Sequence, residues 1–69
     1  MVALNHQAPR GQYRIISVDT FDGTDWHACD LHTLSVAEAY ARREAAQKVF
    51  LALSIYDDQG RQCGDYRRP

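Results

Sequence analysis

Residues 12–33 read QYRIISVDTFDGTDWHACDLHT, and this stretch decides the fold. β-Branched and aromatic side chains lie on both sides of Asp22-Gly23, which predicts a first strand over residues 12–21 and a returning strand over residues 24–33. Asp-Gly is a strong signal for a two-residue type I′ turn, because both turn positions need positive φ, which Gly adopts freely and Asp tolerates. The sequence therefore predicts a β-hairpin.

A two-residue turn also sets which residues oppose each other across the hairpin. Ile16 then faces Cys29, and Arg14 faces Leu31. Because successive side chains of a strand alternate between its two faces, the hairpin separates its apolar residues into two sets. The set expected to face the core is Ile16, Val18, Cys29 and Leu31.

The next stretch, SVAEAYARREAAQK at residues 35–48, predicts a helix over about residues 36–48. Ser35 and Glu38 have the spacing of a capping box, and Thr33 is a competing N-cap. An inner stripe rich in alanine would let this helix lie close to a sheet. The stripe consists of Leu34, Ala37, Tyr40 or Ala41, Ala45 and Lys48.

Residues 49–58, VFLALSIYDD, alternate between two sets of side chains and predict a third strand. Its aliphatic set, from Val49 to Ile55, is expected to face the helix. Residues 57–60, DDQG, suit a type I turn closed by Gly60 in the left-handed region, followed by a fourth strand over about residues 61–66.

We therefore expect an α+β fold of element order ββαββ, with a four-stranded antiparallel sheet and one helix on one face. Strand order 2-1-3-4 is favoured because neighbours in sequence stay adjacent, while 1-2-4-3 and domain-swapped versions satisfy the same pattern. The expected organisation is a flexible N-terminal tail at residues 1–11, a single domain at residues 12–66 and a C-terminal tail at residues 67–69.

The residues YRIISVDTFDGTDW, the capped Ala-rich helix and YDDQG together resemble a group of small uncharacterised bacterial proteins. The pattern of that group is Y-R-[hydrophobic]-x-S-x-D-T-F-D, then a helix, then a strand that ends in Y-D-D-x-G. The resemblance covers about residues 13–60 and consists of hairpins and caps. It implies a bacterial or phage origin in the cytosol and brings no known activity.

Three carboxylates, Asp19, Asp22 and Asp25, surround one glycine and suggest a cation site. Calcium needs six or more oxygens around the ion. The predicted hairpin instead keeps Asp22 in the turn, where its side chain bonds the local backbone, and places the other two on opposite faces. We expect a turn here and no metal.

His27, Cys29, His32 and Cys63 offer zinc-binding atoms, but His32 points away from the first two on a strand. Cys29 and Cys63 lie on opposite edges of a 2-1-3-4 sheet, which excludes a disulfide and predicts two free thiols. Neither cysteine precedes a glycine-rich turn or a helix start that would lower its pKa. A domain of this length also has little volume for a cleft of about 300 Å³. We expect no catalytic residue, no cofactor and no enzymatic activity.

Eight Lys and Arg residues nearly balance nine Asp and Glu residues, so the chain has no long-range field to attract nucleic acid or an anionic membrane. The N-terminal residues do not resemble a signal peptide, and no stretch approaches the roughly 20 apolar residues of a membrane span. We expect a cytoplasmic protein without nucleic-acid or membrane partners.

A single helix can cover only one face of a four-stranded sheet, so the other face needs a different cover. Contiguous exposed apolar side chains usually mark a contact surface, and aromatic residues favour interface cores. The predicted contact residues are Tyr13, Ile15, Trp26, Ala28, Phe50, Ala52, Tyr56 and Tyr66.

We expect this face to join two copies of the chain in a homodimer, which makes the protein a small interaction or regulatory module. A stable partner protein is one alternative. Another is a cover from within the chain, by residues around Ala3 and Leu4 or by the C-terminal YRRP. A functional alternative is a small-ligand or single-stranded nucleic-acid binder that uses the same face with Arg14 and the C-terminal arginines.

Overall fold

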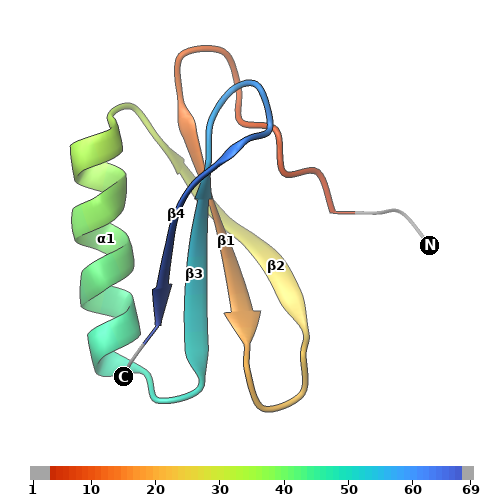
Figure 1. Cartoon of the computed structure of the whole chain (residues 1–69), viewed down its shortest axis with the longest axis vertical. Coiled ribbons are helices and arrows are strands. Elements are labelled where there is room, and N and C mark those ends of the chain that lie inside the picture. The colour runs from red at the N-terminus through yellow and green to blue at the C-terminus, as the bar shows by residue number, and fades with distance from the viewer. Residues whose placement is uncertain (1–3, 68–69) are drawn as a thin grey trace.

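The computed structural model describes residues 4–67, which form an α+β fold of order ββαββ. Its elements are β1 (Tyr13–Asp19), β2 (Asp25–Leu31), α1 (Leu34–Gln47), β3 (Leu51–Tyr56) and β4 (Gln62–Arg67). The four strands of the described residues pair antiparallel in the order β2-β1-β3-β4, which confirms the predicted topology. Figure 1 shows α1 beside β4 and β3, with β2 at the opposite edge of the sheet. Parts of both predicted tails, residues 1–3 and 68–69, lie outside the described residues.

The core lies between α1 and the sheet. The three alanines of the inner stripe, Ala37, Ala41 and Ala45, are buried, as their helical spacing predicts. Small side chains allow the helix backbone to approach the strands closely. From the sheet, the buried core residues are Ile15, Leu51, Leu53 and Ile55.

The β1–β2 connection differs from the predicted two-residue turn. The Asp19 N–H donates to the Thr24 carbonyl at 2.8 Å, and the Gly23 N–H donates to the Asp19 carbonyl at 2.7 Å. A four-residue loop, residues 20–23, therefore joins the strands. Gly23 has a φ of 81°, whereas no residue other than glycine in the described chain has positive φ. Asp22 thus does not adopt the conformation that a type I′ turn requires, and the prediction was wrong.

The register of the hairpin differs as well, because the pairing shifts between Ile15 and Ile16. Ile16 opposes His27, Ile15 opposes Cys29, and Ala28 is left as the extra residue of a β-bulge. One extra residue reverses the face of every side chain beyond it. Cys29 therefore joins Ile15 on the helix side, whereas the predicted partner Ile16 lies on the opposite face, and the predicted core face was wrong in this respect.

Thr33 is the N-cap of α1, since its Oγ1 accepts a hydrogen bond from the Val36 N–H at 3.2 Å. Of the two predicted caps, the structure selects this one, and the Ser35–Glu38 box does not form. The helix begins at Leu34 and ends at Gln47. The Leu51 N–H then donates to the Lys48 carbonyl at 3.2 Å, so Val49 and Phe50 form a turn and not the predicted start of β3.

The β3–β4 turn agrees with the prediction. The Gly60 N–H donates to the Asp57 carbonyl at 3.1 Å, and Gly60 has a φ of 77°. The Asp57 carboxylate accepts two further backbone N–H groups, from Gln59 and Arg61. These hydrogen bonds lower the pKa of Asp57, with the bond from Arg61 as the largest cause.

The N-terminal segment, residues 4–12, contacts the domain although it was predicted as a flexible tail. The Ala8 N–H donates to the Asp57 carbonyl at 3.1 Å, and Ala8 is buried. Gln7 Nε2 donates to the Asp58 carbonyl at 2.9 Å. The His6 ring stacks on the Tyr56 ring with centroids 4.5 Å apart. The segment therefore covers part of the sheet face opposite α1, called the far face below.

The far face is not the apolar surface that the sequence predicted. Ile16 and Ala52 lie on it but are buried, and Ser54 pairs between Ile16 and Asp65. Polar residues of β1, β2 and β4 surround these central positions. They are Arg14, His27, Asp30, Gln62, Asp65 and Arg67.

Candidate interaction surface

Two loops meet at the end of the molecule where α1 finishes. The Thr20 N–H of the β1–β2 loop donates to the Phe50 carbonyl of the α1–β3 turn at 2.7 Å. The rings of Phe21 and Phe50 contact edge to face, with centroids 5.6 Å apart. The edge-to-face geometry is a favourable aromatic arrangement and orients the two rings relative to each other. Residues far apart in sequence are therefore brought together here.

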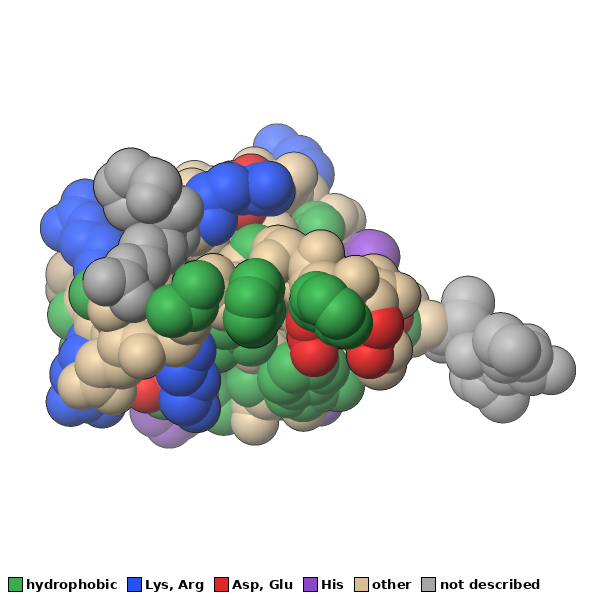
Figure 2. Space-filling view, turned by 90° about the horizontal axis from the view of Figure 1, so that it is seen from below, with side chains coloured by type: hydrophobic (Ala, Val, Ile, Leu, Met, Phe, Trp, Pro, Cys, Tyr) green, Lys and Arg blue, Asp and Glu red, His purple; other side chains and the backbone are tan. Residues whose placement is uncertain are grey.

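Four large apolar side chains are exposed at this end, and we call them the end patch: Phe21, Trp26, Val49 and Phe50. Their exposed fractions are 80%, 42%, 62% and 58%. Seen from this end, hydrophobic side chains form a row across the surface in Figure 2. Single exposed apolar residues are ordinary, but a contiguous group of aromatic residues is typical of a contact surface.

A shallow pocket of about 320 Å³ lies within the end patch. It is lined by Trp26, Val49 and Phe50 together with Leu51, and by Asp19 and Lys48. Trp26 opposes Ser17, which opposes the core residue Leu53, so Trp26 lies on the helix side of the sheet. α1 approaches β2 near Leu31, whereas Trp26 at the other end of the strand remains exposed.

Carboxylates adjoin the end patch (Figure 2). Asp19 Oδ1 accepts the Phe21 N–H at 2.8 Å, and Asp22 Oδ1 accepts the Thr24 N–H at 2.9 Å. The hydrogen bond from Thr24 lowers the pKa of Asp22, so this side chain is ionised at neutral pH. The ammonium of the adjacent Lys48 is bound to Glu44 at 3.1 Å. The carboxylates of Asp19, Asp22 and Glu44 therefore outnumber the ammonium of Lys48 in this region.

Most of the eight predicted contact residues do not lie together. Ile15 is fully buried in the core, and Tyr13 and Ala28 pack against it. Tyr66 lies under the helix, where its hydroxyl donates to Glu38 Oε2 at 3.1 Å and Arg42 lies 5.6 Å from its ring centroid.

The remaining predicted residues divide between two surfaces. Ala52 and Tyr56 lie on the far face, the first buried and the second stacked against His6. Trp26 and Phe50 line the same pocket. Of the predicted residues, only this last pair contributes to the end patch in the described chain. Phe21 and Val49 were not among the predicted contact residues, and their only sequence signal is that large apolar residues occupy turn positions where polar ones are usual.

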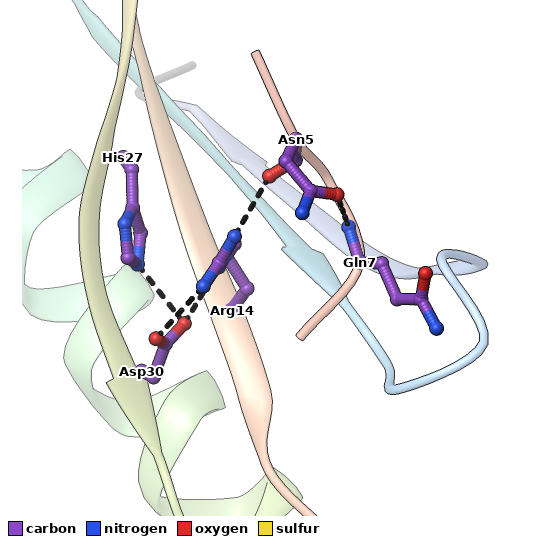
Figure 3. A network of polar contacts seen from close by, with 5 residues as sticks. All are labelled: Asn5, Gln7, Arg14, His27 and Asp30. Atoms are coloured by element: carbon purple, nitrogen blue, oxygen red, sulfur yellow. Dashed lines mark hydrogen bonds and ion pairs between the residues drawn. The ribbon is translucent and has the colours of Figure 1, made fainter. Parts of the chain in front are cut away.

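A polar network on the far face was a second candidate (Figure 3). Arg14 donates from Nε to Asp30 Oδ1 at 2.8 Å and from Nη2 to Asp30 Oδ2 at 3.1 Å. Arg14 Nη1 donates to the Asn5 carbonyl at 3.0 Å, and His27 Nε2 lies 3.0 Å from Asp30 Oδ1. The network joins β1, β2 and the N-terminal segment. Because Arg14 binds both Asp30 and the Asn5 carbonyl, the network holds these three segments together.

Cys29 and Cys63 are both free, and burial raises the pKa of each thiol, so neither is a ready thiolate nucleophile at neutral pH. Among residues 4–67, no three His, Cys, Asp or Glu side chains lie together in an arrangement that holds a metal ion.

A second hollow, of about 340 Å³, lies between α1 and β2 and is lined by Leu31, Val36, Ala39, Tyr40 and Arg43. From the sequence we expected little volume for a cleft of about 300 Å³, whereas the described residues form two open surface hollows of about this size. The lining of the second hollow, mostly apolar with one arginine, holds no pair of acid and base groups.

No helix in the described part of the chain has the length and apolar character that crossing a bilayer requires. Comparisons of the chain with protein families, with curated proteins and with solved structures give no match. Its function therefore has to be inferred from its own geometry.

Proposed function

We propose that this chain is a small protein-interaction module that binds its partner through the end patch. The observation that carries the proposal is the exposure of four large apolar side chains at one end of the molecule, three of which line one pocket. Removing a large apolar side chain from water contributes about 1.5–3 kcal/mol. Phe21, Val49 and Phe50 lie in turns, where the backbone does not require an apolar side chain, and Trp26 lies near the start of β2. Contact with a partner protein would remove these side chains from water and gain this free energy.

The far face supports the proposal less well than the end patch does. Its central apolar positions, Ile16 and Ala52, are already buried, and polar side chains surround them. The homodimer expected from the sequence was based on this face and has no geometric support there. A second copy of the chain remains one kind of protein partner for the end patch, and a cytoplasmic location and bacterial origin remain predictions from the sequence.

Panning a library of random displayed peptides against the immobilised protein tests the proposal. We expect the enriched peptides to lose binding to Val49→Ser and Phe50→Ser, because both changes remove apolar surface from the patch. Val36→Ser is the matched control, since Val36 is also 52% exposed but lies on α1 outside the patch. Peptides that bind all three variants alike would contradict the proposed surface.

Light scattering shows whether the partner is a second copy. If the chain dimerises through the end patch, Phe50→Asp will convert a dimer into a monomer, because a carboxylate cannot be buried in an apolar contact without a partner. A monomeric wild type leaves the patch free for a different protein.

A further inference from the structure

We infer that the end patch selects a basic segment of a partner protein, in which a large apolar side chain is flanked by Lys or Arg. The inference rests on the proposed function and names the chemistry of the partner.

The pocket suits a single apolar anchor. Its walls come from Trp26, Val49, Phe50 and Leu51, and its volume of about 320 Å³ is at the small end of the range for ligand pockets. Protein contacts usually depend on a few such anchors, each inserted in a pocket of the partner. An aliphatic or aromatic side chain from an exposed segment therefore fits this site.

The charged residues beside the pocket determine which residues of the partner segment are favoured on either side of its apolar anchor. Asp19 lines the pocket, and Asp22 lies in the loop that also carries Phe21. Asp25 opposes Val18, which opposes Ala52, so Asp25 lies on the far-face side of the sheet and does not belong to the charge at the pocket. The nearby cation, Lys48, is bound to Glu44. Exposed rings of Phe21 and Trp26 also attract cations through their faces.

The same negative charge disfavours a second copy of the chain, nucleic acids and anionic lipids as partners of the end patch. In a two-fold contact through this patch, each copy presents the same surface, so the carboxylates of the two copies would lie near one another. Like charges placed together select against that contact. Phosphate groups of nucleic acids or anionic lipids meet the same repulsion. We therefore expect the isolated chain to be monomeric at this surface.

Trp26 provides the readout, because it is the single tryptophan of the chain and lines the pocket. The probes are two short peptides with a central Leu-Phe-Leu, one flanked by lysines and its twin flanked by glutamates. We expect the lysine peptide to change Trp26 fluorescence with a dissociation constant about tenfold lower than that of its twin at low ionic strength. The difference should shrink as salt is added, because rim charges are screened.

A variant that lacks these carboxylates tests whether they cause the preference for the lysine peptide. Asp19→Asn combined with Asp22→Asn removes two charges at the pocket, while the introduced amide oxygens still accept the Phe21 and Thr24 N–H groups and preserve the loop. This variant should lose most of the preference for the lysine peptide. Asp58→Asn combined with Asp65→Asn is the control: it changes the net charge equally on the β3–β4 turn and β4 and should keep the preference.

The outcomes separate this inference from the proposed function. Equal binding of both peptides, or tighter binding of the glutamate twin, overturns the charge selection while the end patch remains a contact surface. If neither peptide alters Trp26 fluorescence up to about 1 mM, the basic-segment inference is overturned, and the panning result alone decides the proposed function. A dimer that dissociates on Phe50→Asp substitution also overturns it, because a second copy then occupies the site.

Discussion

At the scale of single residues, Gly23 shows how one backbone angle supports the end patch. Its φ of 81° closes the loop that carries Phe21, and a Cβ at this position would meet no atom within 4 Å. The cost of a side chain here is therefore purely conformational. Gly23→Ala should lower the free energy of unfolding by about 1–2 kcal/mol in urea denaturation. Gly23→Asn should cost less, because Asn tolerates the left-handed region; an alanine variant as stable as wild type would contradict this account.

The ionisation of Asp30, again a single residue, should make the stability of the fold depend on pH. The hydrogen bond from Arg14 is the largest cause that lowers the pKa of Asp30, and His27 contributes in the same direction. In the unfolded chain the pKa of an aspartate is about 3.9. A pKa that is lower in the folded state adds stability above about pH 4, and this stability is lost as the pH falls through the folded pKa.

The test of this pH dependence compares thermal unfolding of wild type and Asp30→Asn from neutral to acidic pH. The variant should be less stable near neutral pH, and the difference should narrow as the pH falls from about 4 through the lower pKa that Asp30 has in the folded protein. A difference that stays constant over the acidic range would show that ionisation of Asp30 does not contribute.

At the scale of elements, the start of α1 depends on one hydroxyl. Thr33 Oγ1 accepts the Val36 N–H, whereas Ser35 lies inside the helix and is exposed. Thr33→Ala should therefore lower the free energy of unfolding by about 1 kcal/mol. Ser35→Ala should be nearly neutral or slightly stabilising, because alanine has the highest helix propensity. Chemical denaturation of both variants checks the assignment. A larger loss of stability in Ser35→Ala than in Thr33→Ala would mean that the Ser35–Glu38 capping box, and not Thr33, caps the helix.

In the hairpin, the sequence predicts the strands but not the bulge that sets their pairing. The strands and the helix follow from side-chain periods of 2 and 3.6, which depend on neighbours along the chain. The bulge at Ala28 changes the face of Cys29 and Leu31, yet alanine carries no turn or bulge signal of the kind that glycine provides. Packing of Cys29 and Leu31 against the helical alanines selects the shifted register over the regular one.

At the scale of the whole molecule, the N-terminal segment completes the fold. Hydrogen bonds from Ala8, Gln7 and Gly11 reach the β3–β4 turn, and Arg14 holds the Asn5 carbonyl. Deleting residues 1–8 should lower the free energy of unfolding by about 1–3 kcal/mol, since several hydrogen bonds and the burial of Ala8 are lost. Urea denaturation measures the effect, and fluorescence of an apolar dye should rise as the far face is uncovered. An unchanged unfolding midpoint would mean that the segment adds no stability.

The end patch also exists only at this scale. Trp26 and Phe50 were predicted to share a surface, but for the wrong reason, because the sheet face that was expected to hold them is divided between the core and the far face. Phe21 and Val49 join them because two loops meet at one end of the sheet. That meeting follows from strand order together with the residue at which α1 ends, which sequence periodicity places only to within a residue or two.

The amino-acid sequence by itself determined the element order, the strand order, the alanine stripe of α1 and the glycine turn at Gly60, because each depends on local periodicity or on the conformational freedom of one residue. Only the tertiary structure decided which face of β1 lies against the helix, how the N-terminal segment covers the far face and which apolar side chains remain in water. These features depend on contacts between residues distant in the chain. One extra residue in β2 reverses the faces of the side chains beyond it, and the local sequence pattern gives no sign of that extra residue.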